Sequence, residues 1–118
     1  MSCSYIYDGY TQDGLILAKE GLHDEIRFLF RPKVGRSRAA VYDKMGLRET
    51  RADREDVINE AIASAIVEWN VRNGDESTVP PDIEHIEKIH PAAKPSMFEQ
   101  IMGNKPKERD DQQDAAKN

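Results

Sequence analysis

The chain has 118 residues, a length that fits one domain and leaves no room for two. Its hydrophobic fraction of 38% and charged fraction of 33% are polar for a globular domain, yet too apolar for a fully disordered chain. The net charge of −5 argues against a nucleic-acid partner, because proteins that bind nucleic acid usually carry a net basic domain.

The N-terminal third predicts an irregular arm followed by a β-hairpin. Residues 1–14 carry tyrosines among Asp-Gly turn signals, which indicates an arm or a short edge strand. Residues 26–31 then alternate between apolar and basic side chains, as a half-buried strand does, and Pro32 ends the strand because it has no N–H to donate. We therefore expect a hairpin over residues 15–32.

The rest of the domain, residues 35–103, predicts about four helices. The first spans 37–45, and the second begins after a cap at Thr50 and continues for about 20 residues toward Asn73-Gly74. Two short helices follow, each bounded by proline or glycine, over 81–90 and 95–102. The second helix is predicted from apolar residues at spacings of three and four: Val57, Ile58, Ala61, Ile62, Ala65, Ile66 and Trp69.

The predicted fold is therefore α+β, a single domain over residues 1–103 with an N-terminal hairpin packed on helices. Residues 104–118 contain no large apolar side chain, so we expect a disordered tail there. Residues 1–20 lack the pattern of a signal peptide, and no apolar run approaches the ~20 residues of a membrane helix. The single cysteine, Cys3, excludes an internal disulfide and favours a reducing compartment.

No residue pattern predicts an enzyme, a cofactor or a metal centre. Glu87 and His90 match the Glu-x-x-His spacing of di-iron bundles, which need two such motifs and two further glutamates on facing helices. The other match, Glu20 to His23, lies in a predicted turn, and the second helix offers just Glu60 and Glu68, so surface histidine is the better interpretation. The stretch around Ser37 resembles a nucleophile elbow, which needs a large parallel sheet that this chain is too short to build. The sequence also lacks phosphate-binding glycine loops and paired cysteines.

Two groups of side chains are candidates for binding a partner. The first is an apolar patch on the last short helix, where flexible methionines suit irregular partners, although the same residues could form a lid on the core. It consists of Met97, Phe98, Ile101 and Met102. The second is a group of basic residues that could bind acidic protein or phosphate, or could simply be solvated: Arg27, Arg31, Lys33, Arg36 and Arg38.

Two stretches resemble a known family. One is the strand 26–31 ending at Pro32, and the other is Trp69 near the predicted helix end, followed by an acidic loop and Val79-Pro80. This order is similar to that of small tail assembly chaperones of long-tailed bacteriophages and prophages. The resemblance implies a phage protein that acts in the cytoplasm of the bacterial host. It would bind the tape measure protein until tail tube subunits polymerise around it, and it would be absent from the mature virion.

Three further readings stay open at this stage. The chain could be a structural virion protein, such as a head-tail or tail-completion subunit. It could instead be a small regulatory protein that binds nucleic acid or a host factor through Arg27–Arg38. Self-association is also open. If the chaperone reading holds with the apolar patch as the binding face, replacing Phe98 and Met102 by alanine should weaken client binding and change the melting temperature little.

Overall fold

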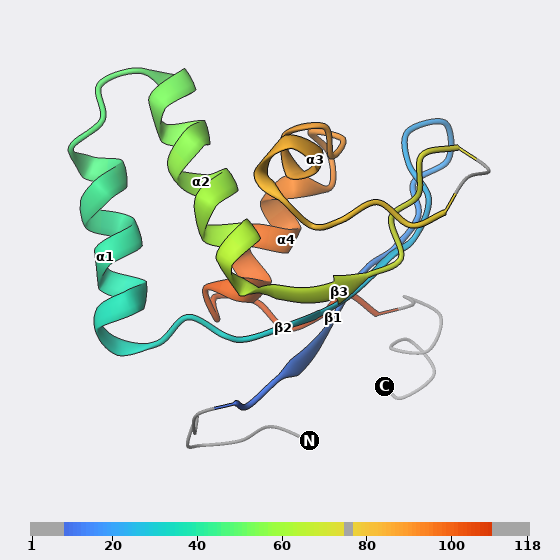
Figure 1. The fold of residues 1–118 in the computed structure, drawn as a ribbon, viewed down its shortest axis with the longest axis horizontal. Helices are drawn as coiled ribbons and strands as arrows, with labels where there is room; N and C mark the ends of the chain where they lie inside the picture. Colours follow the sequence, from blue (N-terminus) through green and yellow to red (C-terminus); the bar gives the residue numbers. More distant parts are fainter. Residues whose placement is uncertain (1–8, 75–76, 110–118) are drawn as a thin grey trace, which may run out of the picture.

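Three strands and four helices make up the part of the chain that the computed structural model describes, residues 9–74 and 77–109. The strands form one antiparallel sheet in the order β1–β2–β3, and the helices lie over one face of it (Figure 1). The fold is therefore α+β, as the sequence predicts. The elements in chain order are β1 (Gln12–Ile16), β2 (Ile26–Phe30), α1 (Gly35–Gly46), α2 (Arg51–Ala65), β3 (Ile66–Trp69), α3 (Ile83–Glu87) and α4 (Lys94–Ile101).

The N-terminal hairpin is formed by β1 and β2. Its register pairs Gly14 with Phe28, and the alternating residues Ile26, Phe28 and Phe30 all point into the core. The first strand begins at Gln12, inside the arm predicted over residues 1–14. The earlier part of that arm, including Cys3, lies outside the described residues.

The predicted long second helix is wrong over its last turns, because the chain becomes a strand at Ile66. Thr50 caps α2 as expected, its hydroxyl accepting from the Asp53 N–H at 3.1 Å, but the helix ends at Ala65. The following residues pair with β2, and the register shifts where Leu29 pairs with Glu68 and Phe30 with Ile66. Val67 is the extra residue of this bulge.

The bulge explains why the sequence suggested a helix here. In a regular strand, residues three apart point to opposite faces, so Ile66 and Trp69 could not both be buried. The unpaired Val67 restores them to one face, and both are less than a tenth exposed. The Trp69 indole N–H then donates to the Val79 carbonyl at 2.6 Å. A spacing of three, typical of a helix, is produced by a bulged strand.

The C-terminal segment also differs from its prediction over residues 104–109. The Glu108 backbone N–H donates to the Leu15 carbonyl at 3.0 Å, and the Glu108 carboxylate accepts from the Leu17 N–H at 2.9 Å and from the Ser96 hydroxyl at 2.6 Å. These bonds cover the outer edge of β1, which would otherwise expose unpaired backbone groups. Polar contacts, which the composition did not reveal, hold this part of the predicted tail. Residues 110–118 lie outside the described residues.

Candidate partner-binding site

The apolar patch predicted on the last helix is part of the hydrophobic core. Met97 and Ile101 are fully buried, and Phe98 and Met102 are 6% and 1% exposed. The helix α4 lies between the sheet and α2, so both sides of its apolar stripe meet other elements. In this fold the four residues offer almost no surface to a partner, and their assignment as an exposed binding patch is wrong.

An apolar groove with a volume of about 650 Å³ opens beside this buried helix. Its walls come from the end of α1, the first half of α2, and the segment that joins α3 to α4. Phe98 is among the residues that line it, so one member of the predicted patch does border an open surface. The apolar lining residues are Met45, Ile58, Ile89, Pro91, Pro95 and Phe98.

Lys94 belongs to the wall of this groove, although its side chain is buried. It is 7% exposed, and its ammonium donates to Glu55 Oε2 at 2.6 Å and to Asn59 Oδ1 at 3.1 Å. A third, longer bond at 3.4 Å goes to the Glu87 carbonyl. A buried charge is tolerated when it is paired and hydrogen-bonded, so this network ties α2, α3 and α4 together and fixes the shape of the groove.

The rim of the groove carries charges of both signs. Lys88 and Lys105 supply positive charge, whereas Glu55, Glu87 and Glu99 supply negative charge. Just beyond Met45, in the α1–α2 connection, Leu47 is 81% exposed, more than any other large apolar side chain of the described residues. An apolar channel with a mixed polar rim is typical of sites that bind an amphipathic helix.

The predicted basic group does not form one cluster in space. Arg27 lies on the exposed face of β2 and pairs with Glu25 at 2.6 Å. Arg31 and Arg36 are exposed, at the end of β2 and the start of α1. These three remain available as surface charges, whereas Arg38 has a different role.

Arg38 holds α1 against the end of α4. Its Nε donates to the Met102 carbonyl at 2.9 Å and its Nη2 donates to Asn104 Oδ1 at 2.7 Å. The guanidinium also lies 5.1 Å from the centre of the Tyr42 ring, within the range of a cation–π contact. These bonds give Arg38 a structural role in this fold, and its part in partner binding stays a prediction.

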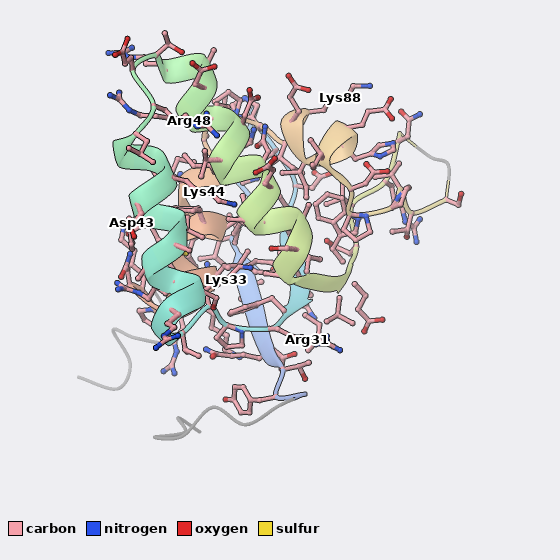
Figure 2. All side chains as sticks on the ribbon, turned by 60° about the vertical axis from the view of Figure 1, so that its left-hand side comes forward. Arg31, Lys33, Asp43, Lys44, Arg48 and Lys88 are labelled. Atoms are coloured by element: carbon pink, nitrogen blue, oxygen red, sulfur yellow. The ribbon has the colours of Figure 1, made fainter. Side chains whose placement is uncertain are left out.

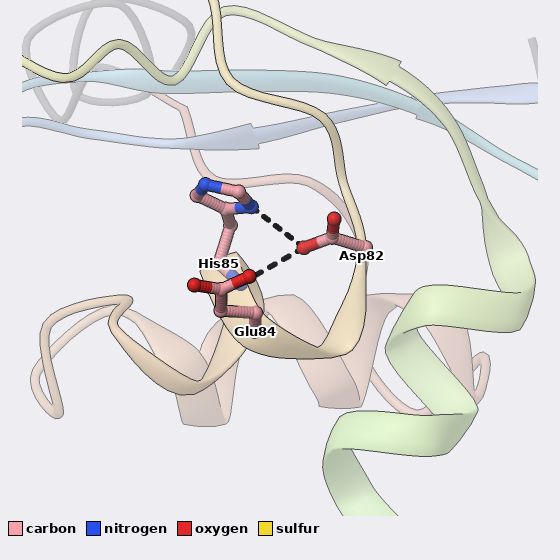
Figure 3. Close-up of side chains that lie close together, drawn as sticks. All are labelled: Asp82, Glu84 and His85. Carbon is pink, nitrogen blue, oxygen red and sulfur yellow. Dashed lines mark hydrogen bonds and ion pairs between the residues drawn. The ribbon is translucent and has the colours of Figure 1, made fainter.

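One group of potential metal ligands occurs among the described residues, at the start of α3 (Figure 3). The ligand atoms of Asp82, Glu84 and His85 lie within 4.8 Å of one another. Asp82 Oδ1 accepts from the His85 backbone N–H at 3.0 Å and bonds to its Nδ1 at 2.6 Å, and these bonds lower the pKa of Asp82. This is a helix cap whose oxygen is already occupied, so we interpret the group as structural.

Comparison of the chain with models of protein families, with curated proteins and with solved structures finds no match. Within the described residues, none of the helices combines the length and the apolar character needed to cross a membrane. The candidate site is therefore defined by geometry alone. It is the groove beside α4, which sequence reasoning missed because its walls come from segments that lie far apart in the chain.

Proposed function

We propose that this chain is a non-enzymatic tail assembly chaperone of a long-tailed bacteriophage or prophage, acting in the cytoplasm of the bacterial host. The single observation that carries the proposal is the apolar groove of about 650 Å³ between α2 and the α3–α4 segment. The resemblance in sequence indicates which proteins the chain would bind, namely the tape measure protein and the tail tube subunits. The chaperone leaves before the virion is complete.

The lining of the groove suits a client helix. Met45 and Ile58 are only partly buried, so a client side chain can still cover apolar surface on both. An amphipathic helix places apolar residues at spacings of three and four, which a groove of this kind accepts one after another. Flexible Met45 can adapt to several such segments, which a chaperone needs when its client is long and repetitive.

The arrangement of charge supports release as well as binding. The groove rim carries two lysines and three glutamates, with Lys94 already neutralised by Glu55. Exposed charges on a rim contribute little net affinity and mainly favour correct partners. A client held chiefly through apolar contacts in one small groove binds reversibly, so polymerising tube subunits can displace the chaperone.

The proposal is tested by co-expressing the chain with a tape measure protein from the same phage or prophage and measuring the soluble fraction of that client. In the variant Met45→Gln with Ile58→Gln, we expect the soluble client and the co-purified complex to fall at least about fivefold, a loss of about 1 kcal/mol. The matched control is Leu22→Gln with Val67→Gln, since these side chains are 52% and 45% exposed and lie outside the groove.

Melting temperatures of both variants establish that the fold survives. Client solubility that is unchanged in the groove variant, or equally reduced in the control, would contradict the groove as the binding site. Mass spectrometry of purified virions separates the chaperone from a structural virion protein. The chain should be absent from the finished particle, and stoichiometric amounts in the virion would contradict a chaperone role.

A further inference from the structure

A second surface, separate from the groove, is distinguished by its charge. Residues 31–48 contain six basic residues and one acidic residue, a net charge of +5. The whole chain has a net charge of −5, so the remaining residues together carry −10. Such a concentration of one sign creates a local potential that attracts an oppositely charged partner.

The fold arranges much of this charge along the line where α1 faces α2. Lys33 and Lys44 lie between the two helices, with Arg31 toward one end of the row and Arg48 toward the other (Figure 2). Asp43, the single acid of this stretch, lies on the outer side of α1. The acid is therefore turned away from the row of basic residues.

Between the helices the row encloses a cleft of about 280 Å³. Its polar lining includes both lysines, Glu60 and two serines, and its floor is apolar. The floor consists of Ala40, Val41, Val57 and Ala61. A cleft of this size and lining fits one side chain that has an aliphatic stem and a charged end.

The hydroxyl groups in the cleft are already committed as donors. The Ser64 hydroxyl donates to the Ala61 carbonyl at 2.9 Å while accepting from Lys33 Nζ at 2.6 Å. The Ser37 hydroxyl donates to the Val34 carbonyl at 2.9 Å. The charged groups that meet a ligand in the cleft are therefore the two ammonium groups and the carboxylate of Glu60, and only the ammonium groups attract an anion.

Neither ammonium group is neutralised within the described part of the chain. No carboxylate oxygen of residues 9–74 or 77–109 lies within 4.0 Å of Lys33 or Lys44. Burial, together with the nearby charge of Lys44, lowers the pKa of Lys33. Two like charges held beside an apolar floor oppose each other, and an anion placed between them would relieve that repulsion.

We propose that the cleft between α1 and α2 binds a carboxylate side chain from an acidic segment of a protein partner, with Lys33 and Lys44 as its two charged contacts. Arg31 and Arg48 then meet further acids of the same segment. The chain's overall charge of −5 opposes a long polyanion, which favours an acidic protein over nucleic acid. The apolar floor also suits the methylenes of a glutamate.

The test uses the full chain and two fluorescent probes at low salt, a helical peptide with glutamates every four residues and a short DNA duplex. Fluorescence anisotropy measures both affinities. Lys33→Gln with Lys44→Gln should weaken peptide binding about tenfold, since two charge contacts are lost. Lys19→Gln with Lys107→Gln removes the same charge from exposed positions outside the cleft and should weaken it less than about twofold.

Equal losses in the two variants would overturn the proposal, because binding would then depend on total charge and not on the cleft. No loss in the cleft variant would overturn it as well. DNA binding that is tighter than peptide binding, and that is lost in the same cleft variant, would assign the surface to nucleic acid and reject an acidic protein partner. A melting curve for each variant ensures that a loss of affinity reflects the cleft and not unfolding.

Discussion

The helices α4 and α1 differ in how much of each the fold buries. In α4, five of eight residues are buried, whereas in the 12 residues of α1 only Val41 is buried. The helix α4 packs against both the sheet and α2, whereas α1 has α2 as its main neighbour among the helices and strands. The apolar stripe of the short helix α4 therefore belongs to the hydrophobic core. The helix α1, which has little apolar surface, is the one that remains accessible to a partner.

The buried helix also stabilises the sheet through a polar contact. Gln100 is 3% exposed, and its side chain accepts from the Leu15 N–H at 3.2 Å and donates to the Leu15 carbonyl at 2.9 Å. This pair of bonds replaces the strand that β1 lacks on its outer side. The helix α4 is thus held in place by its apolar side chains and by the side-chain amide of Gln100. In contrast, α1 depends on Arg38 for its contact with the end of α4.

The largest expected effect is the loss of the fold when two buried side chains in and at the end of α4 are shortened to alanine. Phe98→Ala with Met102→Ala removes two nearly buried side chains, and each change alone costs about 2–5 kcal/mol. Since a small domain has only about 5–15 kcal/mol of stability, the double variant should be largely unfolded by circular dichroism. This reverses the expectation from sequence that such a variant would lose client binding and keep its melting temperature.

The matched change on the exposed side is Tyr42→Ala with Leu47→Ala, at side chains that are 37% and 81% exposed. Its melting temperature should fall far less than that of the α4 variant. Comparable losses in the two variants would contradict the contrast between a core helix and a surface helix.

A smaller effect on stability is expected from replacing two glycines by alanine: Gly14, which faces the Phe28 ring, and Gly46, at the end of α1. A methyl group on Gly14 would lie 2.2 Å from the nearest Phe28 ring atom, whereas one on Gly46 would meet nothing within 4 Å. We expect Gly14→Ala to cost about 1–3 kcal/mol, because the ring must move within a packed core. Gly46→Ala should be neutral or stabilising by up to about 1 kcal/mol.

Urea unfolding of both variants measures these changes. A destabilisation of less than about 0.5 kcal/mol for Gly14→Ala would show that Phe28 can leave the glycine without strain. Destabilisation of similar size at Gly46 would contradict the open surroundings of the end of α1.

Local patterns predicted the hairpin and the helices, and contacts distant in sequence account for what was missed. Alternation of Ile26, Phe28 and Phe30 identified β2, and Thr50 identified the start of α2. The third strand was missed because the bulge at Val67 gives a spacing that a helix also gives. The groove could not be predicted, since it needs Met45 and Phe98 to meet across elements far apart in the chain.

The smallest effect concerns the charge of the basic row and depends on pH. The pKa of Lys33 is lowered by burial, and secondly by Lys44, from the ordinary lysine value of about 10.4. The unfolded chain therefore holds this proton more tightly, so charged Lys33 opposes folding at neutral pH. That opposition disappears as the pH rises through the folded-state pKa toward the unfolded-state value.

The difference in unfolding free energy between the wild type and Lys33→Gln isolates this contribution, because all other titrating groups are shared. The difference in unfolding free energy should move in favour of the wild type as the pH rises from neutral toward the ordinary lysine pKa of about 10.4. In the background of Lys44→Gln the same difference should move less, since one of the two causes of the lowered pKa has been removed. A difference that stays flat with pH, or that is identical with and without Lys44, would contradict the close pair of lysines on which the second binding surface depends.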